Sequence, residues 1–597
     1  MGAGFADNSN PSLLIFDYSQ NNNTYNWENS LKRNFDFGRL RCDLDVNTSS
    51  TLIKKPFKYW QEHLWTNFRA DYKIADGFSL TPYMSHSRNA LQKKIIYTSE
   101  LKLTMPYKRF KYFEINPFIA NKAIKRVGDE PTGVDKGLGY GFSTNSKPLK
   151  ILGNHMESSV SYKYYDLNRI PYSEFSARLG GLMVWSAADT LQWILKDVES
   201  TTRYIAGQLP EEKDIVNIVR QVKVDRRAEY LARISLPVSF SARLNGDLSF
   251  ISYYYNSEAN ISSIMQSDNY TEGRNFNVEL EKILFGKVQL SSGYRYSWSE
   301  EDFGRSELDQ WHEMGELSFK ASAEISPDDS ASFNGIVGVT SYYGLRGGSA
   351  YDRDLKTQIC NLRYKRMFNR YFTGEIMFSY SNFYQIYTSR YNSANNNQNE
   401  TYILRSIFNW DLTSGIEINQ SYEIRANYII YDYVPNPIET PSRIFRRGSS
   451  ETGLNLRLSD KFSLMPGYTY RYEDYGKLIW AENNWQQATG WDRRYHSLSV
   501  KISYYPFRNF GIEPECSWES KKEYDHKLDD SGPTFERGNI VREERLDELK
   551  KIAAINITWN FSQSERLNLS YSRRKWENMG KVIDISEFVS ASVRYTF

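Results

Sequence analysis

The sequence predicts an all-β fold: a membrane-spanning closed antiparallel up-and-down β-barrel of about 26 strands, within a range of about 24–28. Three observations predict it. Segments that alternate apolar and polar residues follow one another along the 597 residues, short and long connections alternate between them, and 15% of the chain is aromatic. Mean hydropathy is −0.62, which fits a membrane barrel because only every second strand residue faces lipid.

Composition excludes several other classes of protein. No run of about 18 apolar residues is present, so no transmembrane helix is expected. The 75 basic and 72 acidic residues give a net charge of +3, and we therefore expect no nucleic-acid partner. Three isolated cysteines, Cys42, Cys360 and Cys516, lack the CxxC spacing of a zinc site and the CxxCH spacing of a c-type haem. We expect this chain to hold no metal and no cofactor.

The end of the chain carries the most specific signal. Apolar side chains occupy every second position from 589 to 597, and the last residue is aromatic. This strand resembles the closing strand of outer-membrane β-barrel proteins of Gram-negative bacteria, which is a recognition signal for the insertion machinery. Tyr595 and Phe597 match that signal, whereas Ser592 stands where glycine is usual. The resemblance implies the bacterial outer membrane, with its lipid and the barrel-insertion machinery as partners, and a periplasmic C-terminus.

The start of the chain is expected to lie outside the barrel. Residues 1–33 are assigned to a periplasmic N-terminal segment and residues 34–597 to the barrel. Gly4-Phe5-Ala6 resembles the end of a signal-peptide cleavage site, so we expect the sequence to begin inside a signal peptide or at the mature end.

Turns of two to five residues join the strands on one side of the expected barrel, among them Asn245-Gly246, which is typical of a type I′ turn. The turns lie at 75–77, 106–109, 245–246, 285–287, 326–330, 368–370, 414–415, 459–461, 506–509 and 562–565. Connections on the other side are longer, as at 392–400 and 521–551. An outer-membrane barrel sorts its connections in this way, with short turns in the periplasm and long loops outside.

One region departs from the strand pattern. Residues 186–213 contain Leu191, Ile194, Leu195 and Val198 near helical spacing, and Gly207 is a candidate C-cap. We expect a helical insertion on the periplasmic side, packed under the barrel rim or acting as a partial plug, followed by a strand at 216–224.

The polar faces of the strands supply the candidate site residues. Between 416 and 430 one face is free of charge, as expected where a charge in lipid costs about 2–4 kcal/mol. The opposite faces of this and nearby strands are expected to line the lumen with side chains of both signs: Arg363, Lys365, Arg405, Asp411, Glu417, Glu423 and Arg425. A wall of mixed charge suits water, a neutral solute or a polar protein surface, because an ion-selective pore needs one predominant sign.

No enzyme signature is found, and no catalytic residue is assigned. His312-Glu313 lacks the second histidine of a zinc HExxH motif. His526 lies beside Asp525, Asp529 and Asp530, a pattern more typical of a solvated loop than of a catalytic pair. The chain is therefore not expected to be an enzyme.

The width of the expected barrel leads to the functional hypothesis. Barrels of about 22 strands already contain a plug. TonB-dependent receptors carry a plug of well over a hundred residues before the barrel, and the lipopolysaccharide-export barrel carries a periplasmic domain and paired cysteines; neither pattern is found here. Residues 160–169 and 290–302 resemble strand ends in the sheath barrels of porin–cytochrome electron conduits. That resemblance implies a channel or sheath for a trans-envelope complex, with a periplasmic multihaem cytochrome as a possible partner in the lumen. The alternative is a passive porin for small solutes, narrowed by its loops.

Overall fold

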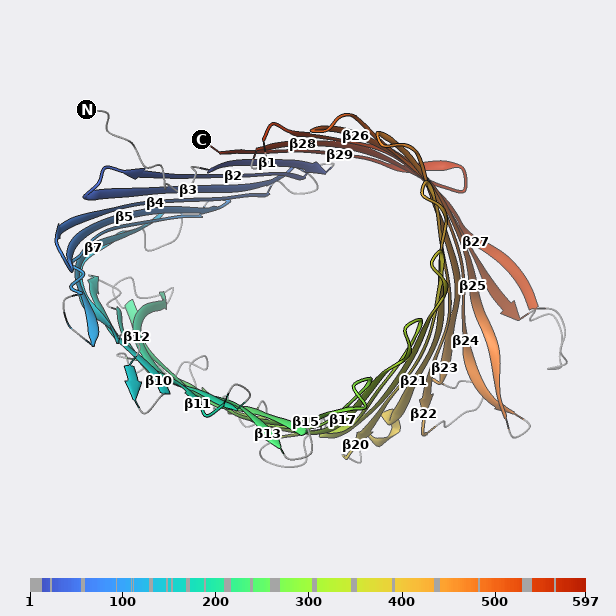
Figure 1. Cartoon of the computed structure of the whole chain (residues 1–597), viewed down its shortest axis with the longest axis horizontal. Helices are drawn as coiled ribbons and strands as arrows, with labels where there is room; N and C mark the ends of the chain where they lie inside the picture. The colour runs from blue at the N-terminus through green and yellow to red at the C-terminus, as the bar shows by residue number, and fades with distance from the viewer. Residues whose placement is uncertain are drawn as a thin grey trace.

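The computed structural model describes the chain except residues 1–12, 22–23, 55–58, 93, 109, 111, 128–132, 147–148, 152–153, 168–171, 187–188, 209–215, 237–239, 258–268, 303–308, 345–351, 389–391, 434–440, 482–483, 529–539, 563–564 and 597. The described residues form one antiparallel sheet whose first strand pairs with its last, so that the sheet closes into a flattened ring (Figure 1). Among these residues, no helix is long and apolar enough to cross a membrane.

The wall consists of strands joined mainly to their neighbours in sequence. They are β1 (Leu13–Asn21), β2 (Thr24–Asp36), β3 (Leu40–Ile53), β4 (Tyr59–Ala75), β5 (Phe78–Leu91), β6 (Lys94–Thr104), β7 (Phe113–Val127), β8 (Gly133–Ser146), β9 (Leu149–Ile151), β10 (Asn154–Leu167), β11 (Tyr172–Val184), β12 (Thr190–Gln208), β13 (Val216–Leu236), β14 (Phe240–Ser257), β15 (Asn269–Leu284), β16 (Val288–Asp302), β17 (Gln310–Ser326), β18 (Asp329–Gly344), β19 (Arg353–Asn369), β20 (Phe372–Tyr387), β21 (Asn397–Thr413), β22 (Ile416–Tyr431), β23 (Arg443–Ser459), β24 (Phe462–Ala481), β25 (Asn484–Phe507), β26 (Phe510–Leu528), β27 (Ile540–Asn560), β28 (Arg566–Asn578) and β29 (Lys581–Thr596). Among the described residues, one 3-10 turn, η1 (Ser393–Asn395), precedes β21.

β8 and β9 share one position in the wall. β8 pairs with β10, and the short β9 pairs with the beginning of the same strand. The described wall therefore has 28 strand positions. The predicted fold class is confirmed, and the number of positions lies at the upper end of the predicted range of about 24–28.

Alternation of residue type explains why these segments pair into a wall with two different faces. Directly opposite residues of antiparallel strands point to the same side of a sheet. Around the wall, Leu362 lies opposite Phe378, Phe378 opposite Leu404, and Leu404 opposite Ile424. Ile424 is 64% exposed in the isolated chain. We call this side the apolar face; its large exposed side chains are suited to lipid.

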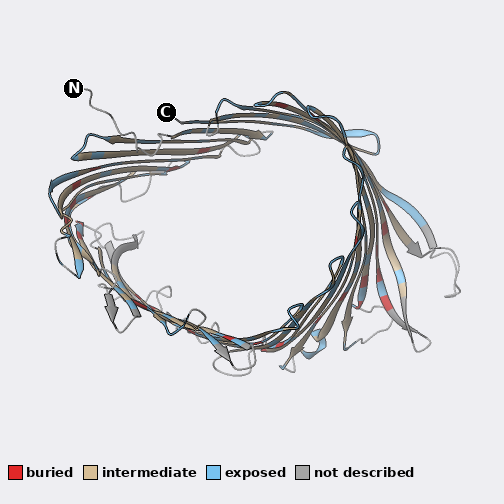
Figure 2. Ribbon diagram, viewed as in Figure 1, coloured by how far each residue is buried: buried red, intermediate tan, exposed pale blue. Residues whose placement is uncertain are grey.

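The core of this molecule is not central. Buried residues form short separate patches along the wall (Figure 2). The largest cluster of buried apolar side chains, Phe118, Ala120, Tyr165 and Leu167, lies where the ring bends beside β7. A closed wall instead gains its stability from strand pairing without free edges.

Aromatic rings form two bands on the apolar face. Near the short turns, ring centroids of neighbouring strands lie 5.2 Å apart for Phe372 and Trp410, and 6.4 Å apart for Phe462 and Tyr504. Towards the long loops, Tyr402 lies 5.0 Å from Tyr380. Two such girdles mark the interfaces of a membrane with water, because tyrosine and tryptophan combine an apolar body with a polar group.

The expected helix at 186–213 is wrong over its described residues, and 187–188 and 209–213 lie outside them. Residues 190–208 form β12, which pairs with β11 over residues 190–202 and with β13 over residues 190–208. The apolar residues that suggested helical spacing fall on both faces of this strand, with Leu191 and Leu195 on the apolar face and Ile194 on the other. A helix here would have left the facing edges of β11 and β13 unpaired in hydrocarbon, which membrane barrels avoid. The expected strand at 216–224 is the first part of β13.

The boundary at residue 34 is also wrong, because β1 and most of β2 lie before it. β1 closes the barrel by pairing with β29, and Leu14 and Phe16 lie opposite Tyr595 and Val593. The alternation of β1 is short, at nine residues, so it gives a weak signal in the sequence. Its place is determined by the partner strands on both sides.

The turn at Asn245-Gly246 is not formed either, since both residues lie inside β14. Most of the other expected turns that fall on described residues occur where predicted, for example between β15 and β16 and between β21 and β22. The alternation from Ala242 to Phe250 runs through Asn245-Gly246 without a change of phase. That continuity outweighs the local turn preference.

Candidate functional site: the lumen wall

The second face of the wall, which we call the polar face, carries all seven residues singled out for the lumen. Arg363 lies opposite Met377, Met377 opposite Arg405, and Arg405 opposite Glu423. The alternating geometry of a strand places the remaining four on the same side: Lys365, Asp411, Glu417 and Arg425. Because the apolar face is suited to lipid, we infer that the polar face lines the lumen.

Some of these residues are brought together and others are not. Arg405 and Glu423 lie opposite each other, yet Glu423 forms its ion pair with Arg447, at 2.5 Å. Asp411 and Glu417, two carboxylates, also lie opposite each other. Lys365 and Arg405 have no partner among the described residues. The seven residues therefore do not form a single binding or catalytic site.

Cross-strand partners complete the site and were not identified from the sequence. Arg363 holds Glu375 through two hydrogen bonds, of 2.8 and 2.7 Å. Similar pairs recur around the polar face, such as Lys163–Glu174 at 3.0 Å and Lys501–Glu513 at 3.0 Å. Only the register between strands reveals these pairs, because partners lie 11 to 24 residues apart in the chain. Much of the wall thus neutralises its own charges.

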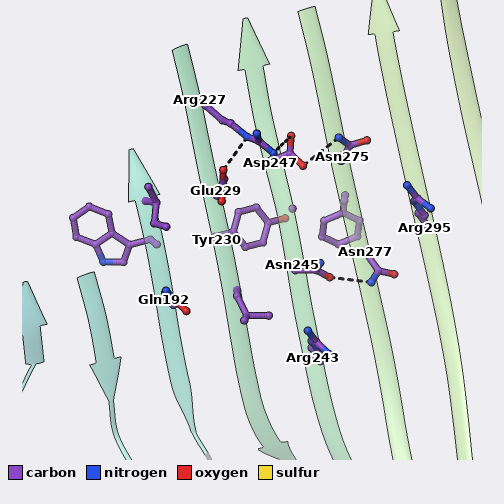
Figure 3. A pocket seen from close by; sticks show the side chains of 15 residues that line it. Gln192, Arg227, Glu229, Tyr230, Arg243, Asn245, Asp247, Asn275, Asn277 and Arg295 are labelled. Carbon is purple, nitrogen blue, oxygen red and sulfur yellow. Dashed lines mark hydrogen bonds and ion pairs between the residues drawn. The ribbon is translucent and has the colours of Figure 1, made fainter. Parts of the chain in front are cut away.

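A cavity of about 480 Å³ lies against β12 to β16. Polar side chains from five neighbouring strands line most of it (Figure 3). Arg227 pairs with Glu229 at 2.8 Å and approaches Asp247 at 4.0 Å. Amide ladders cross the next strands: Asn275 donates to Asp247 at 3.1 Å, and Asn277 donates to Asn245 at 2.9 Å. The arrangement offers guanidinium and amide donors to a polar ligand.

The bend of the wall beside β7 gives the polar face a different character. Gly139 and Gly141 of β8 lie on this face, opposite Tyr165 and Phe118 of the neighbouring strands. A Cβ atom added to Gly139 would lie 2.4 Å from a ring carbon of Tyr165. The glycines therefore leave room for the rings to lie over the β8 backbone. We call the buried cluster of Phe118, Ala120, Tyr165 and Leu167, with these glycines, the corner.

The corner is bordered by cations rather than open to the lumen. The ammonium nitrogen of Lys102 lies 4.0 Å from the ring centroid of Phe118, and that of Lys122 lies 5.0 Å from that of Tyr165. The Tyr165 hydroxyl donates a 2.6 Å hydrogen bond to Glu100. Cation–π contacts of this kind shield the rings from water while the ammonium groups stay hydrated.

Long strands continue the wall beyond the membrane on the side of β24 to β27 (Figure 1). A tilted strand needs only about 9–11 residues to cross, whereas β25 has 24. In the half of these strands far from the short turns, three nearly buried carboxylates, Asp474, Asp492 and Glu523, are held by arginines. The pairs are Arg446–Asp474 at 2.9 Å, Arg542–Asp492 at 2.5 Å and Arg493–Glu523 at 2.6 Å. We call this network the charged extension.

Two of the histidines named in the sequence analysis, His312 and His526, contact polar side chains. His526 of the charged extension lies 2.6 Å from Asp492, which also binds Arg542. On the polar face, His312 lies 2.9 Å from the hydroxyl of Ser299, and its other ring nitrogen has no carboxylate partner among the described residues. In the described part of the chain, no group of three or more His, Cys, Asp and Glu side chains is placed to hold a metal ion.

Of the two residues of the expected insertion signal, Tyr595 lies among the described residues. Tyr595 lies on the apolar face of β29, 46% exposed, opposite Leu14 of β1. It contributes an aromatic ring close to the end of the closing strand. Phe597 lies outside the described residues.

Comparisons with known proteins concern the fold alone. No protein-family model and no curated protein matches the chain. Solved structures that match include the ferric citrate transporter FecA in unliganded form, at 9% identity and a TM-score of 0.35, covering 98% of this chain and 79% of that one. BauA, the ferric preacinetobactin receptor of Acinetobacter baumannii, matches at 8% identity and a TM-score of 0.38, covering 98% and 80%. The FrpB iron transporter of Neisseria meningitidis, F5-1 variant, matches at 11% identity and a TM-score of 0.38, covering 77% and 80%.

These values are too low to assign a function to this chain. The features of the chain itself decide its class: a wall closed by β1 and β29, an apolar face with large exposed side chains, and two aromatic girdles. They are the features of a bacterial outer-membrane β-barrel.

Proposed function

We propose that this barrel is the outer-membrane scaffold of a larger complex and holds a polypeptide in its lumen. The observation that carries the proposal is the size of the wall, with 28 strand positions. Strands about 4.8 Å apart, tilted by about 40°, give a perimeter of roughly 175 Å, equivalent to a circle of roughly 55 Å between backbones. A folded domain of about 100 residues, with a radius of gyration of about 13 Å, is narrower than a circle of that size.

The chemistry of the polar face supports a protein occupant. Acidic and basic side chains both occur around it, and many are paired within the wall, as in Arg363–Glu375 and Lys163–Glu174. Serine and asparagine side chains lie between them, for example Asn361 and Ser379. A surface of this kind matches a soluble protein surface through hydrogen bonds and water, without selecting ions of one sign.

A passive channel for small solutes is the second candidate function. The polar cavity at β12 to β16 favours it, because donors such as Arg243 and Asn245 face a space of about 480 Å³. In that case the long connections would narrow the lumen. The presence or absence of a stoichiometric partner distinguishes the two candidates.

The polypeptide in the lumen could belong to one of several classes of periplasmic protein. A periplasmic multihaem cytochrome, which would make the barrel the sheath of an electron conduit, is one of them. None of the comparisons favours this class. Haem absorbance in the purified complex distinguishes a cytochrome from any other polypeptide.

The decisive experiment is mild detergent extraction of the barrel from its native membrane, followed by mass spectrometry and haem spectroscopy of whatever accompanies it. We expect one polypeptide in a fixed ratio to the barrel, and a large rise in bilayer conductance when that polypeptide is stripped away. A barrel that purifies alone and conducts small ions at once would contradict the scaffold and leave the channel.

A further inference from the structure

Two arginines face each other on the polar face without a counter-ion from the wall. Arg233 of β13 lies directly opposite Arg243 of β14. Directly opposed like charges destabilise a strand pair. Both side chains are exposed, and neither has an ion pair or a hydrogen bond among the described residues. Arg243 borders both the 480 Å³ cavity and a smaller one of about 310 Å³ that Arg233 also lines.

Two carboxylates, Glu279 and Glu281, line the same smaller cavity as these arginines but are hydrogen-bonded to other side chains. Glu279 lies opposite Arg243, but its carboxylate accepts a 3.0 Å hydrogen bond from Ser291 and lies 3.9 Å from Lys320. Glu281 accepts a hydrogen bond from Gln289. Two further carboxylates on β13 and β14, Glu229 and Asp247, are both in ion-pair contact with Arg227.

Amide donors extend the cationic pair towards the cavity. Asn245 lies two residues from Arg243 on the same face, and its carbonyl oxygen accepts from Asn277 (Figure 3). The amide nitrogen of Asn245 has no partner among the described residues, so it remains a donor. Arg295 borders the same cavity and lies opposite Glu316, without an ion pair within 4.0 Å. Glu316 is therefore the carboxylate that would compete with a bound oxyanion for the guanidinium of Arg295.

Another arginine pair shows how the wall treats the same arrangement elsewhere. Arg425 of β22 lies opposite Arg447 of β23 on the polar face. There the neighbouring Glu423 supplies an ion pair to Arg447, at 2.5 Å. At this pair the wall supplies a counter-ion to Arg447, whereas among the described residues it supplies none to Arg233 or Arg243.

We propose that Arg233 and Arg243, with the amide of Asn245, form a binding site for an oxyanion, a carboxylate or phosphate group, on the lumen wall near the short turns. Guanidinium groups bind both anions through paired charge-assisted hydrogen bonds. The oxyanion neutralises the opposed arginines. The site does not depend on a polypeptide in the lumen, since a free solute or an acidic side chain of an occupant presents the same group.

The test is calorimetric binding of citrate, and separately of inorganic phosphate, to the detergent-solubilised barrel in low-salt buffer without other oxyanions. The double variant Arg233→Gln/Arg243→Gln is expected to bind at least tenfold more weakly than the parent. The matched control Lys365→Gln/Arg405→Gln removes two other unpaired polar-face charges and is expected to bind within about twofold of the parent. Heat-dependent gel migration verifies that each variant has folded.

Repeating the titration on the native complex identifies the source of the oxyanion. Loss of citrate binding in the complex, with recovery after stripping, assigns the site to acidic groups of the occupant, whereas equal binding in both assigns it to a free solute. Absence of saturable binding by the stripped barrel, or equal loss in both double variants, overturns the site. A barrel that purifies alone would contradict the scaffold and leave this test intact.

Discussion

In the corner beside β7, aromatic rings lie over glycines, whereas in the charged extension of β24 to β27 arginines pair with carboxylates. Phe118 is 5% exposed over Gly141, and Asp492 is 3% exposed between Arg542 and His526. Both regions bury side chains in a wall one strand thick. This wall therefore buries apolar side chains where it bends and pairs charges where it extends into water.

The physical reason lies in what surrounds each region. At a bend, side chains on the inner face converge, so rings can cover one another and the backbone of β8. In the extension no lipid covers either face, and apolar side chains there would expose a large patch to water. Arginine–carboxylate pairs can be held by two hydrogen bonds and remain compatible with solvent.

The largest expected effect is in the corner. Phe118→Ala removes a buried ring and leaves a cavity over Gly141, so we expect a loss of about 3–5 kcal/mol in unfolding free energy. Phe588→Ala is the matched control, since that ring also lies on the polar face but is 37% exposed. Urea unfolding in detergent, followed by tryptophan fluorescence, measures both. Equal losses in the two variants would contradict a specific role of the corner.

The charged extension should respond with a smaller and more local effect. Asp492→Asn removes the charge held by Arg542 and His526, and hydrogen bonds to charged groups contribute about 1.5–3 kcal/mol. We expect faster hydrogen exchange in the far halves of β25 to β27 and unchanged exchange in the membrane-spanning part. The control Asp197→Asn alters a half-exposed pair with Arg226, for which less than about 1 kcal/mol is expected. A uniform rise in exchange over the whole barrel would refute the local role.

Adding a single methyl group at the bend should lower the stability of the barrel by a smaller amount. In Gly141→Ala the new Cβ would lie 2.1 Å from the carbonyl oxygen of Tyr162 and 2.6 Å from the ring of Phe118, so the strands must shift. Overpacking of this kind costs about 1–3 kcal/mol. Gly453→Ala is the control, because nothing lies within 4 Å of its added Cβ. Thermal shift of heat-dependent gel migration ranks the two, and a larger shift for Gly453→Ala would count against the close packing at β8.

Acid should weaken the charged extension. Burial raises the pKa of Asp492, but hydrogen bonds from Arg542 and His526 outweigh burial and leave that pKa below its ordinary value. The contribution of this carboxylate to stability is therefore present above an unfolded pKa of about 3.9, and is lost as the pH falls through the lower folded value. Hydrogen exchange of β25 to β27 at decreasing pH measures it, and Asp492→Asn should abolish most of the dependence.

Several local expectations depended on short stretches of sequence and did not hold. Residues 190–208 contain apolar residues that fit both a helical and a strand period, and only pairing with β11 and β13 decides between them. Asn245-Gly246 has the preference of a turn, but the strand around it continues. The arginine pair of the proposed oxyanion site was missed for that reason, since a turn there would have placed Arg233 and Arg243 in one long strand.

By itself the sequence determined the class of fold and the division of many strands into two faces. That information is local, because lipid on one side and water on the other impose a period of two on each strand, as in β22. Closure by β1 and β29, the 28 positions, the corner and the pairing of Arg363 with Glu375 or Arg542 with Asp492 were decided only by the tertiary structure. These features depend on register between strands, which a one-residue slip would change completely and which no single strand encodes.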